Sequence, residues 1–441
     1  MPQHIYTTAA LYIAREKIMK KKGVTKLKAI VVAIIIVIVV VAGALSYFYI
    51  MAPAGGPEEI RVGASVPMSG ELATWGKYLS FGYRYMLDKI NKEEGGIYID
   101  EVGKKLPVRL IIYDDESSPD KCAKNTERLI LEDKVVALLS SGTPPIGVPG
   151  CTVAERYGVP IITASLPLEV VQEMMPKREY TWNIFFSIAD PDVSIVARYF
   201  QALETVPPEL NNKKLVLFLE DSPEGVAFGN LYKGFAEKYK YQVVYEVYVP
   251  LGTTDFTDMI RKAQASAADI VMGLMIPPEG WAMLKQAYTL GWRPKFMAIS
   301  KAFEPHDFVE AVGARISNGT CHLGFWAPWL YPGGQELADA YMKQYNEFWS
   351  QHIGDAAAAA QVLGDAIKRA RSLDPKKIHE AIKTTDLMTV NGRIRFVTDP
   401  NNPYYHQYII PAFMMQWQNG EFKIVWPPEM SNAQFWYPMP P

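Results

Sequence analysis

The apolar positions of this chain fall into short, nearly continuous runs that alternate with longer stretches of helical periodicity. A run of this kind is typical of a strand that is buried on both faces of a parallel sheet. The runs predict strands at 60–66, 108–113, 135–139, 160–163, 215–219, 243–248, 270–274, 295–299 and 319–325. The stretches between them predict helices at about 76–93, 120–133, 146–157, 190–204, 226–240, 255–266, 278–290 and 335–370.

The alternation of strands and helices predicts an α/β protein whose parallel sheets are covered by helices on both faces. This many strands exceed one sheet of ordinary size, and 441 residues exceed one compact domain. We therefore expect two doubly wound α/β lobes.

The residues before the first predicted strand differ from the rest, because 29–51 carry no charge and are mostly apolar. About twenty such residues suffice for a helix that crosses a bilayer core of about 30 Å. Lysines precede this run, and the linker at 52–59 ends in Glu58 and Glu59. The positive-inside rule therefore predicts that residues 1–28 are cytoplasmic and that the remainder lies outside the cell. A removable signal peptide has the same order of basic and apolar segments, and this alternative stays open.

The net charge and the cysteines bear on which partners and which bonds this protein can form. The formal net charge of -2 provides no basic field, which argues against a nucleic-acid partner. Cys122, Cys151 and Cys321 lie in the part predicted to be exported. An oxidising compartment permits one disulfide with one thiol left over, and three small buried apolar residues are the alternative.

Signatures of enzymes and of metal or phosphate sites are missing from the sequence. The segment GELATWGKY departs from a phosphate-binding loop in its spacing and has Tyr78 where a magnesium ligand belongs. No G-x-G-x-x-G, G-x-S-x-G, H-E-x-x-H or C-x-x-C motif occurs. Asp114, Asp115 and Glu116 form a carboxylate cluster, but acidic and Ser residues just before a helix that has Pro119 at an early position are expected to cap its N–H groups. We therefore expect no enzyme activity, no cofactor and no metal.

Several segments resemble, in order, the periplasmic solute-binding proteins of the branched-chain amino acid type. They are IRVGASVPMSGELATWGKYLSFGYRYMLDKINKEEGGI, VRLIIYDDESSPDKCAKNTERLILEDKVVALLSSG, AERYGVPIITAS, LGTTDFTDMIRKAQASAADIVMG and LKQAYTLGWRPKFM. The resemblance runs from about Ile60 to Asp399. It implies the type I periplasmic binding fold, in which two lobes joined by three crossing segments enclose a small ligand and deliver it to an ABC permease.

The resemblance also implies the domain boundaries. Lobe 1 is expected at 60–187 and 327–388, lobe 2 at 188–326 and 389–426, and a tail rich in proline and aromatic residues at 427–441. The crossings are expected near 186–190, 325–329 and 387–392. Three such segments permit the lobes to close about a hinge. The tail is expected to pack extended over a lobe or to hang loose.

The ligand is expected outside the carboxyl ends of the parallel strands, where helix N-termini present free N–H groups. Trp75, in the loop after the first strand, offers an apolar wall, and packing beneath the following helix is its alternative. The resemblance implies a carboxylate-binding set formed by Ser141, Gly142, Thr143, Ser165 and Leu166.

The sequence departs from the resemblance at two positions of lobe 2. Glu224 stands where the family commonly has a tyrosine, and Ser300 lies in the segment where amino acid binders place an acid against the ligand's ammonium. Burying an ammonium without a carboxylate is costly. Either Glu224 supplies that charge, or the ligand lacks an amine and Met275, Ile276 and Trp326 add apolar wall.

The sequence thus predicts a monomeric, membrane-anchored receptor of an ABC importer, with its binding domain outside the cell. The expected ligand is a small amino acid, an amide, or an aromatic or apolar acid. A ligand-sensing receptor of the same fold without a transport role is the alternative, and it would need a cytoplasmic output domain larger than residues 1–28.

Overall fold

The computed structural model describes Glu16 and residues 56–440. The chain divides into two compact units, Met1–Glu58 and Glu59–Pro441, and all the elements below belong to the second unit. No helix among the described residues is both long enough and apolar enough to cross a membrane. The predicted spanning segment at 29–51 lies outside the described residues.

Lobe 1 is built on a six-stranded sheet in which every neighbouring pair runs parallel. In spatial order its strands are β15 (Gln407–Ile409), β7 (Thr181–Phe185), β6 (Ile161–Thr163), β5 (Ala137–Leu139), β1 (Ile60–Val66) and β4 (Val108–Asp114). β1, which lies between β5 and β4, is buried at all positions except Arg61. This burial on both faces explains its continuous apolar run.

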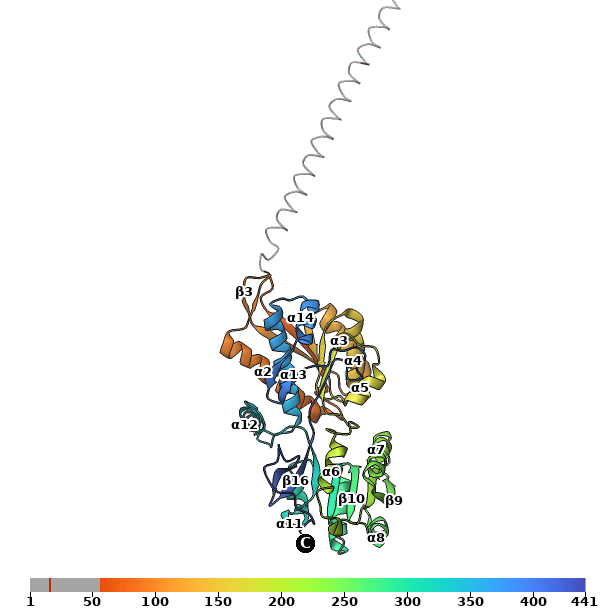
Figure 1. Ribbon diagram of the computed structural model, residues 1–441. Helices are drawn as coiled ribbons and strands as arrows, with labels where there is room; N and C mark the ends of the chain where they lie inside the picture. Colours follow the sequence, from red (N-terminus) through yellow and green to blue (C-terminus); the bar gives the residue numbers. More distant parts are fainter. Residues whose placement is uncertain (1–15, 17–55, 441) are drawn as a thin grey trace, which may run out of the picture. The chain divides into compact units, whose positions relative to one another are not determined.

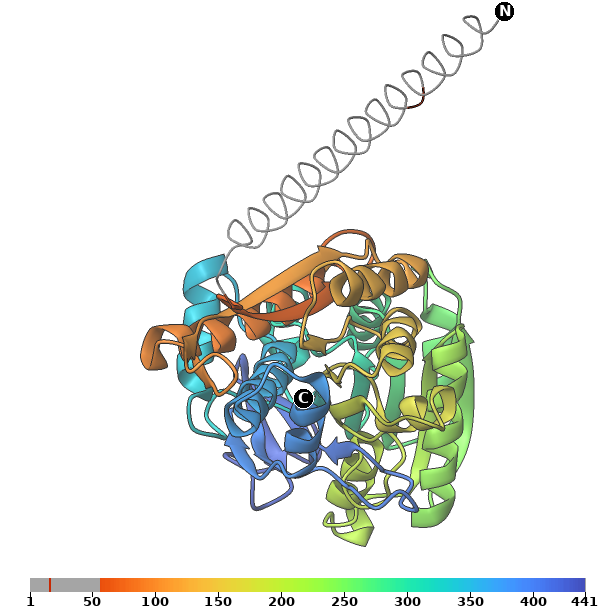
Figure 2. The ribbon, with the colours of Figure 1, turned by 90° about the horizontal axis from the view of Figure 1, so that it is seen from above.

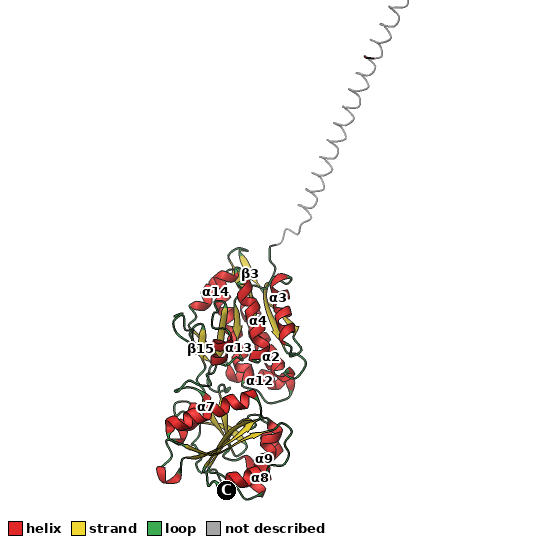
Figure 3. Cartoon of the chain, turned by 90° about the vertical axis from the view of Figure 1, so that its right-hand side faces the viewer, coloured by secondary structure: helices red, strands yellow, loops and turns green. Residues whose placement is uncertain are grey.

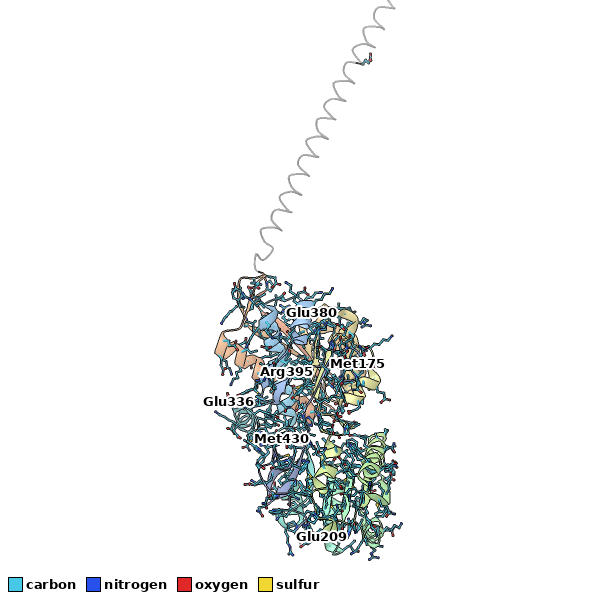
Figure 4. The ribbon with its side chains drawn as sticks, in the orientation of Figure 1. Met175, Glu209, Glu336, Glu380, Arg395 and Met430 are labelled. Atoms are coloured by element: carbon cyan, nitrogen blue, oxygen red, sulfur yellow. The ribbon has the colours of Figure 1, made fainter. Side chains whose placement is uncertain are left out.

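Helices cover both faces of this sheet (Figure 1). The helices of lobe 1 are α2 (Ala73–Glu94), α3 (Pro119–Leu131), α4 (Pro144–Tyr157), α5 (Leu168–Met174), α12 (Gly334–Tyr345), α13 (His352–Ala370) and α14 (Pro375–Lys383). α2 and α13 touch, since a Cβ on Gly82 would lie 2.7 Å from that of Ala356. α3 and α4 enclose a separate apolar cluster with Leu129 and Val148. Glu336 of α12, labelled in Figure 4, accepts a hydrogen bond from Tyr85 of α2 at 2.9 Å.

Lobe 2 is built on a seven-stranded mixed sheet (Figure 3). In spatial order its strands are β17 (Glu421–Trp426), β16 (Phe413–Gln418), β12 (Cys321–Gly324), β11 (Phe296–Lys301), β10 (Ile270–Met275), β8 (Lys214–Glu220) and β9 (Gln242–Val249). The strands from β12 to β9 run parallel, and β16 and β17 are antiparallel. Its helices are α6 (Ile195–Leu203), η1 (Pro208–Leu210), α7 (Pro223–Tyr239), α8 (Thr257–Ala265), α9 (Pro277–Thr289), α10 (Phe308–Val312) and α11 (Ala314–Ser317).

Local sequence explains where helices begin. Ser118 caps α3 with Pro119 directly behind it, and Ser222 caps α7 by accepting from the N–H of Gly225 at 3.0 Å. The cap of α3 is therefore the serine. Serine and acidic residues were both expected to cap this helix, and of these the carboxylates of Asp114 and Asp115 accept hydrogen bonds from neighbouring loops instead.

The chain passes between the lobes after β7, after β12 and after β15. The third passage lies at Ile410 and Ala412, whose N–H groups donate to Phe185 of lobe 1 and Val193 of lobe 2. It was expected near 387–392, where the structure has a hairpin of β13 (Leu387–Thr389) and β14 (Gly392–Ile394). The structure therefore differs from the expected boundary, since β15 belongs to the sheet of lobe 1. Figure 2 gives the view from above, with the late part of the chain in blue and the start of lobe 1 in orange.

Other regions also differ from the pattern of the sequence, since β7, β16 and β17 lie where no strand was expected. The helix expected at 335–370 divides into α12 and α13, because Asn346 ends α12 in the left-handed conformation with a φ of 54°. A hairpin of β2 (Ile97–Ile99) and β3 (Lys104–Leu106) follows α2. The tail packs on lobe 2, where the N–H of Met439 donates to the carbonyl of Lys295 at 2.8 Å.

Candidate ligand-binding site

The carboxyl ends of the parallel strands of the two lobes face one another. Phe185 ends β7 of lobe 1 and Phe325 follows β12 of lobe 2, and their ring centroids are 5.4 Å apart. Beside them, Gln351 of lobe 1 donates to the carboxylate of Glu304 of lobe 2 at 2.9 Å. Ligands of open parallel sheets bind at these strand ends. The candidate site therefore lies between the two edges.

The loop between β1 and α2 is held firmly at the edge of lobe 1. Ser69 donates from its hydroxyl to Asp114 at 2.7 Å, and Ser117 donates to the carbonyl of Ser69 at 2.9 Å. A Cβ on Gly76 would lie 2.0 Å from the carbonyl oxygen of Pro67, so the first turn of α2 presses directly on this loop. The glycine is needed for that close approach.

Trp75 lies half-buried in the first turn of α2. Its ring centroid lies 5.1 Å from that of His352 at the start of α13. A Cβ on Gly142 would lie 3.9 Å from the Cβ of Trp75, so the loops after β1 and β5 adjoin. Trp75 therefore packs against α13 and not beneath the helix that follows its loop, and it stays partly exposed near Gly142.

Ser141 and Thr143 have different surroundings although only one residue separates them. Ser141 is 2% exposed and donates its hydroxyl to Asp115 at 2.6 Å. Burial raises the pKa of Asp115, and Ser65 donates to the same oxygen at 3.3 Å. Thr143 is half-buried at the start of α4 and makes no side-chain cap bond. Thr143 can therefore donate to a ligand, whereas the proton of Ser141 is engaged inside the lobe.

Ser165 and Leu166 follow β6 and also differ. Ser165 is 5% exposed, and its hydroxyl has no hydrogen-bond partner among the described residues. Leu166 is fully buried, and its side chain lies in the apolar cluster beneath α4. Its carbonyl accepts from the side-chain amide of Asn183 at 2.9 Å. An unpartnered buried hydroxyl requires an explanation, and a ligand oxygen would supply its acceptor.

The predicted apolar residues of lobe 2 lie mostly behind its surface. Met275 and Ser300 are 1% and 0% exposed, and the hydroxyl of Ser300 lies 3.5 Å from that of Tyr232. Ile276 is half-buried just before α9. Trp326 is fully buried and donates its ring N–H to Val390 at 2.8 Å, so it forms no cleft wall.

Glu224 stands in the first turn of α7 with its side chain 52% exposed. Its carboxylate accepts from the ammonium of Lys301 at 2.7 Å. The chain itself therefore supplies the cation that faces Glu224, a pairing that the sequence analysis did not anticipate.

A second titratable pair lies where the lobes meet. His352 Nδ1 and Asp355 Oδ2 are 3.5 Å apart, and the side chain of Asp355 is fully buried. Burial raises the pKa of Asp355 to about 6. Burial alone would lower the pKa of His352, but the Asp355 carboxylate outweighs it and raises that pKa. The sequence analysis missed this pair, for which the polar residues in an otherwise alanine-rich helix were a signal.

The structure does not enclose the predicted residues in one cavity. A hollow of about 530 Å³ lies between α7 and the first crossing, with Glu169, Ile188 and Phe235 in its lining, and none of the predicted residues contributes to it. Instead, Trp75, Thr143 and Ser165 lie at the strand ends of lobe 1, while Glu224 and Ile276 lie at those of lobe 2. The three cysteines are buried and free.

Comparisons with known proteins agree with this architecture. The model of the family described as periplasmic binding protein matches residues 59–421. The Leu/Ile/Val-binding protein homolog 7 of Brucella melitensis is 22% identical over 397 residues, which cover 87% of this chain and 96% of the relative.

Two solved structures share the fold. The branched-chain amino acid transporter substrate-binding protein LivJ of Streptococcus pneumoniae, in complex with isoleucine, has a TM-score of 0.65 at 23% identity, covering 82% of this chain and 97% of that one. A solute-binding protein of an ABC transporter from Rhodopseudomonas palustris, in complex with 3,4-dihydroxybenzoic acid, has a TM-score of 0.63 at 19% identity, covering 82% and 93%. The chain belongs to the periplasmic binding protein family.

Proposed function

We propose that this protein is the solute receptor of an ABC importer and that it encloses a small carboxylic acid between its lobes. The observation that carries the proposal is the hydroxyl of Ser165, which is buried at a strand end of lobe 1 and has no partner among the described residues. With Thr143 it offers neutral donors to a carboxylate at an edge that faces the second lobe.

Closure of the lobes is the proposed mechanism. Three crossings allow one lobe to rotate against the other, and the contact between Gln351 and Glu304 lies beside two of them. Rotation would bring Lys301 and Glu224 toward Trp75 and Thr143. Ligand that contacts both edges would favour the closed form, because it binds that form more tightly.

The membrane anchor and the location outside the cell remain part of this proposal. They rest on the uncharged run at 29–51 and on the lysines that precede it. A monomer anchored in this way would present each captured ligand to a permease in the same membrane.

The class of ligand follows from chemistry that two related proteins share. LivJ binds isoleucine and the protein from Rhodopseudomonas palustris binds 3,4-dihydroxybenzoic acid, and both ligands carry a carboxylate. The neutral donors of lobe 1 suit that group. Lobe 2 would bind the opposite end of the ligand and so select which group that end carries.

A ligand panel tests the proposal on the full-length protein in detergent. Amino acids, amides, hydroxy acids and aromatic acids are added in turn while the melting temperature is recorded. At least one carboxylate-bearing compound should raise it, because a ligand that binds only the folded state stabilises that state by mass action. The matched amide of that compound is the control and should give a smaller shift. If no carboxylate in the panel shifts the melting temperature, the proposal is wrong.

A further inference from the structure

A buried histidine lies at the carboxyl edge of lobe 1. His352 is the first residue of α13, and its side chain is 9% exposed. Aromatic rings from both lobes surround its ring, and the centroids of Trp75, Phe185 and Phe325 lie 5.1, 6.2 and 5.2 Å away. His352 therefore contacts the first turn of α2, the end of β7 and the second crossing.

His352 has a carboxylate beside it on the same helix. Its Nδ1 lies 3.5 Å from Oδ2 of Asp355, whose side chain is fully buried. Neither this nitrogen nor either carboxylate oxygen has a hydrogen-bond partner among the described residues. A buried carboxylate without donors is costly unless it takes up a proton or a cation faces it. The two side chains are therefore suited to share a proton, and its gain or loss changes the charge at this edge of lobe 1.

The groups that act on this pair favour its protonated form. Tyr78 of α2 stacks on the histidine ring with 6.4 Å between centroids. Burial, and next the carboxylate of the pair, raise the pKa of Tyr83 on the same helix, so this phenol stays neutral. From lobe 2, the carboxylate of Glu304 favours the charged form of the histidine. Lys77, next to Tyr78, pairs with Glu347 instead.

A bound carboxylate would add a further negative charge near the pair. Trp75 adjoins Gly142 in the loop after β5. Phe185 lies on β7, which pairs with β6, the strand that leads to Ser165. The ring of His352 thus lies between the two loops that are proposed to hold the ligand carboxylate. Closure removes water from this region, and the attraction between an imidazolium and a carboxylate is stronger there than in bulk water.

We propose that capture of a carboxylate by this receptor is coupled to the uptake of one proton from solvent by the pair of His352 and Asp355. The coupling is reciprocal, so affinity increases as the pH falls from 8 toward 6. His352 is a positioning residue here, since it packs on Trp75 and acts on the ligand through its charge. This inference rests on the proposed function and adds the regulation of the same site.

Calorimetry on the full-length protein in detergent measures this proton. The first probes are isoleucine and 3,4-dihydroxybenzoate, and after them the carboxylate of the panel that gives the largest thermal shift. Each is titrated at pH 6.5 in PIPES and in Bis-Tris, because the difference between the two binding enthalpies gives the number of protons taken up. The wild-type protein should take up about half a proton and bind about 3-fold or more tightly at pH 6 than at pH 8.

Two variants of the pair should lose this uptake. His352→Gln removes the titrating ring and should make the affinity independent of pH over this range. Asp355→Asn should do the same, because burial then lowers the pKa of His352 without an opposing carboxylate, and it serves if the first variant fails to fold.

His379→Gln is the matched control. His379 is another buried histidine of lobe 1, and its Nε2 lies 3.2 Å from Glu179. It belongs to α14 and lies near the amino end of β7, away from the edge that faces lobe 2. This variant should take up the same number of protons as the wild-type protein.

The outcomes separate this inference from the proposed function. Binding of a carboxylate without proton uptake, or with proton release, overturns the inference and leaves the receptor function intact. Uptake that persists in either folded variant of the pair also overturns it, because the proton then goes to another group. If no carboxylate of the panel binds, the proposed function is wrong and the inference falls with it.

Discussion

The two edges of the cleft handle charge in different ways. In the loops after β5 and β6, lobe 1 presents neutral groups such as Thr143 and Ser165, and Asp115, which accepts from Ser141 at 2.6 Å, lies behind them. Lobe 2 places its charges at the edge, where Lys301 joins Glu220 and Glu224.

This difference suggests a division of tasks. A neutral wall of hydroxyls can bind any carboxylate with little dependence on the rest of the ligand. A charged wall discriminates strongly, because a like charge facing the ligand costs free energy and an opposite one gains it. Lobe 1 would then hold the group common to all ligands, and lobe 2 would choose among them.

The largest effect is expected from Lys301→Met. Loss of this cation leaves Glu220 buried without a counter-charge and should lower the free energy of unfolding by about 2–3 kcal/mol, below the range for fully buried pairs because Lys301 is partly exposed. Urea unfolding at pH 7.5 measures it. Lys233→Met, which removes the more exposed pair of Lys233 with Glu246, should cost less than about 1 kcal/mol. Equal losses in the two variants would show that Lys301 is an ordinary surface residue.

Asp115→Ala should lower the free energy of unfolding by about 2 kcal/mol, because two buried hydroxyls, Ser141 and Ser65, lose their acceptor. The change also frees the loop after β5, so carboxylate affinity should fall. Asp115→Asn keeps an acceptor oxygen and should cost about half as much. If the asparagine variant is the less stable of the two, the negative charge of Asp115 and not its acceptor capacity supports lobe 1.

The sequence predicted most of the fold, because strands buried on both faces appear as apolar runs. β1, β8 and β10 lie where these runs predicted them. β15 was missed because its residues, Gln407–Ile409, form no continuous apolar run, and a three-residue strand gives no periodicity of its own. Its pairing with β7 depends on contacts that are distant in the sequence.

The candidate site could be predicted only to the level of loops. Loops after parallel strands converge, so the segments containing Ser141 and Ser165 could be named from the strand pattern. The direction of each hydroxyl could not, because it depends on tertiary partners such as Asp115. The pairing of Lys301 with Glu220 joins residues 81 positions apart, and no local pattern indicates it.

The stability of the folded protein should depend on pH through Asp355, which lies in the region between the two edges. Burial raises its pKa to about 6, whereas an unfolded aspartate titrates near 3.9. The folded state therefore loses stability as the pH rises from about 4 through 6. Asp355→Asn should remove this loss and be more stable than the wild-type protein by about 1–2 kcal/mol at pH 8, with little difference at pH 4.

Urea unfolding at pH 4, 6 and 8 measures this dependence. The matched control is Asp365→Asn on the same helix, whose carboxylate pairs with Arg369 at 2.7 Å near the surface. If Asp355→Asn is the less stable protein at pH 8, the His352 pair contributes more than burial costs and the expected sign is wrong.

Ser165→Ala is expected to have the smallest effect on stability of the variants proposed. It should nevertheless weaken the binding of a carboxylate ligand. The hydroxyl of Ser165 has no partner among the described residues, so its loss should alter the free energy of unfolding by less than about 0.5 kcal/mol. Affinity for a carboxylate ligand should fall about 10-fold, since a hydrogen bond to a charged group contributes about 1.5–3 kcal/mol.

Ser317→Ala is the control, because Ser317 is buried but donates to Ala314 at 3.2 Å, away from the cleft. It should lower stability and leave affinity unchanged. The opposite assignment, in which Ser165→Ala destabilises the fold without weakening binding, would make the lobe 1 edge a packing surface and leave recognition to lobe 2 alone.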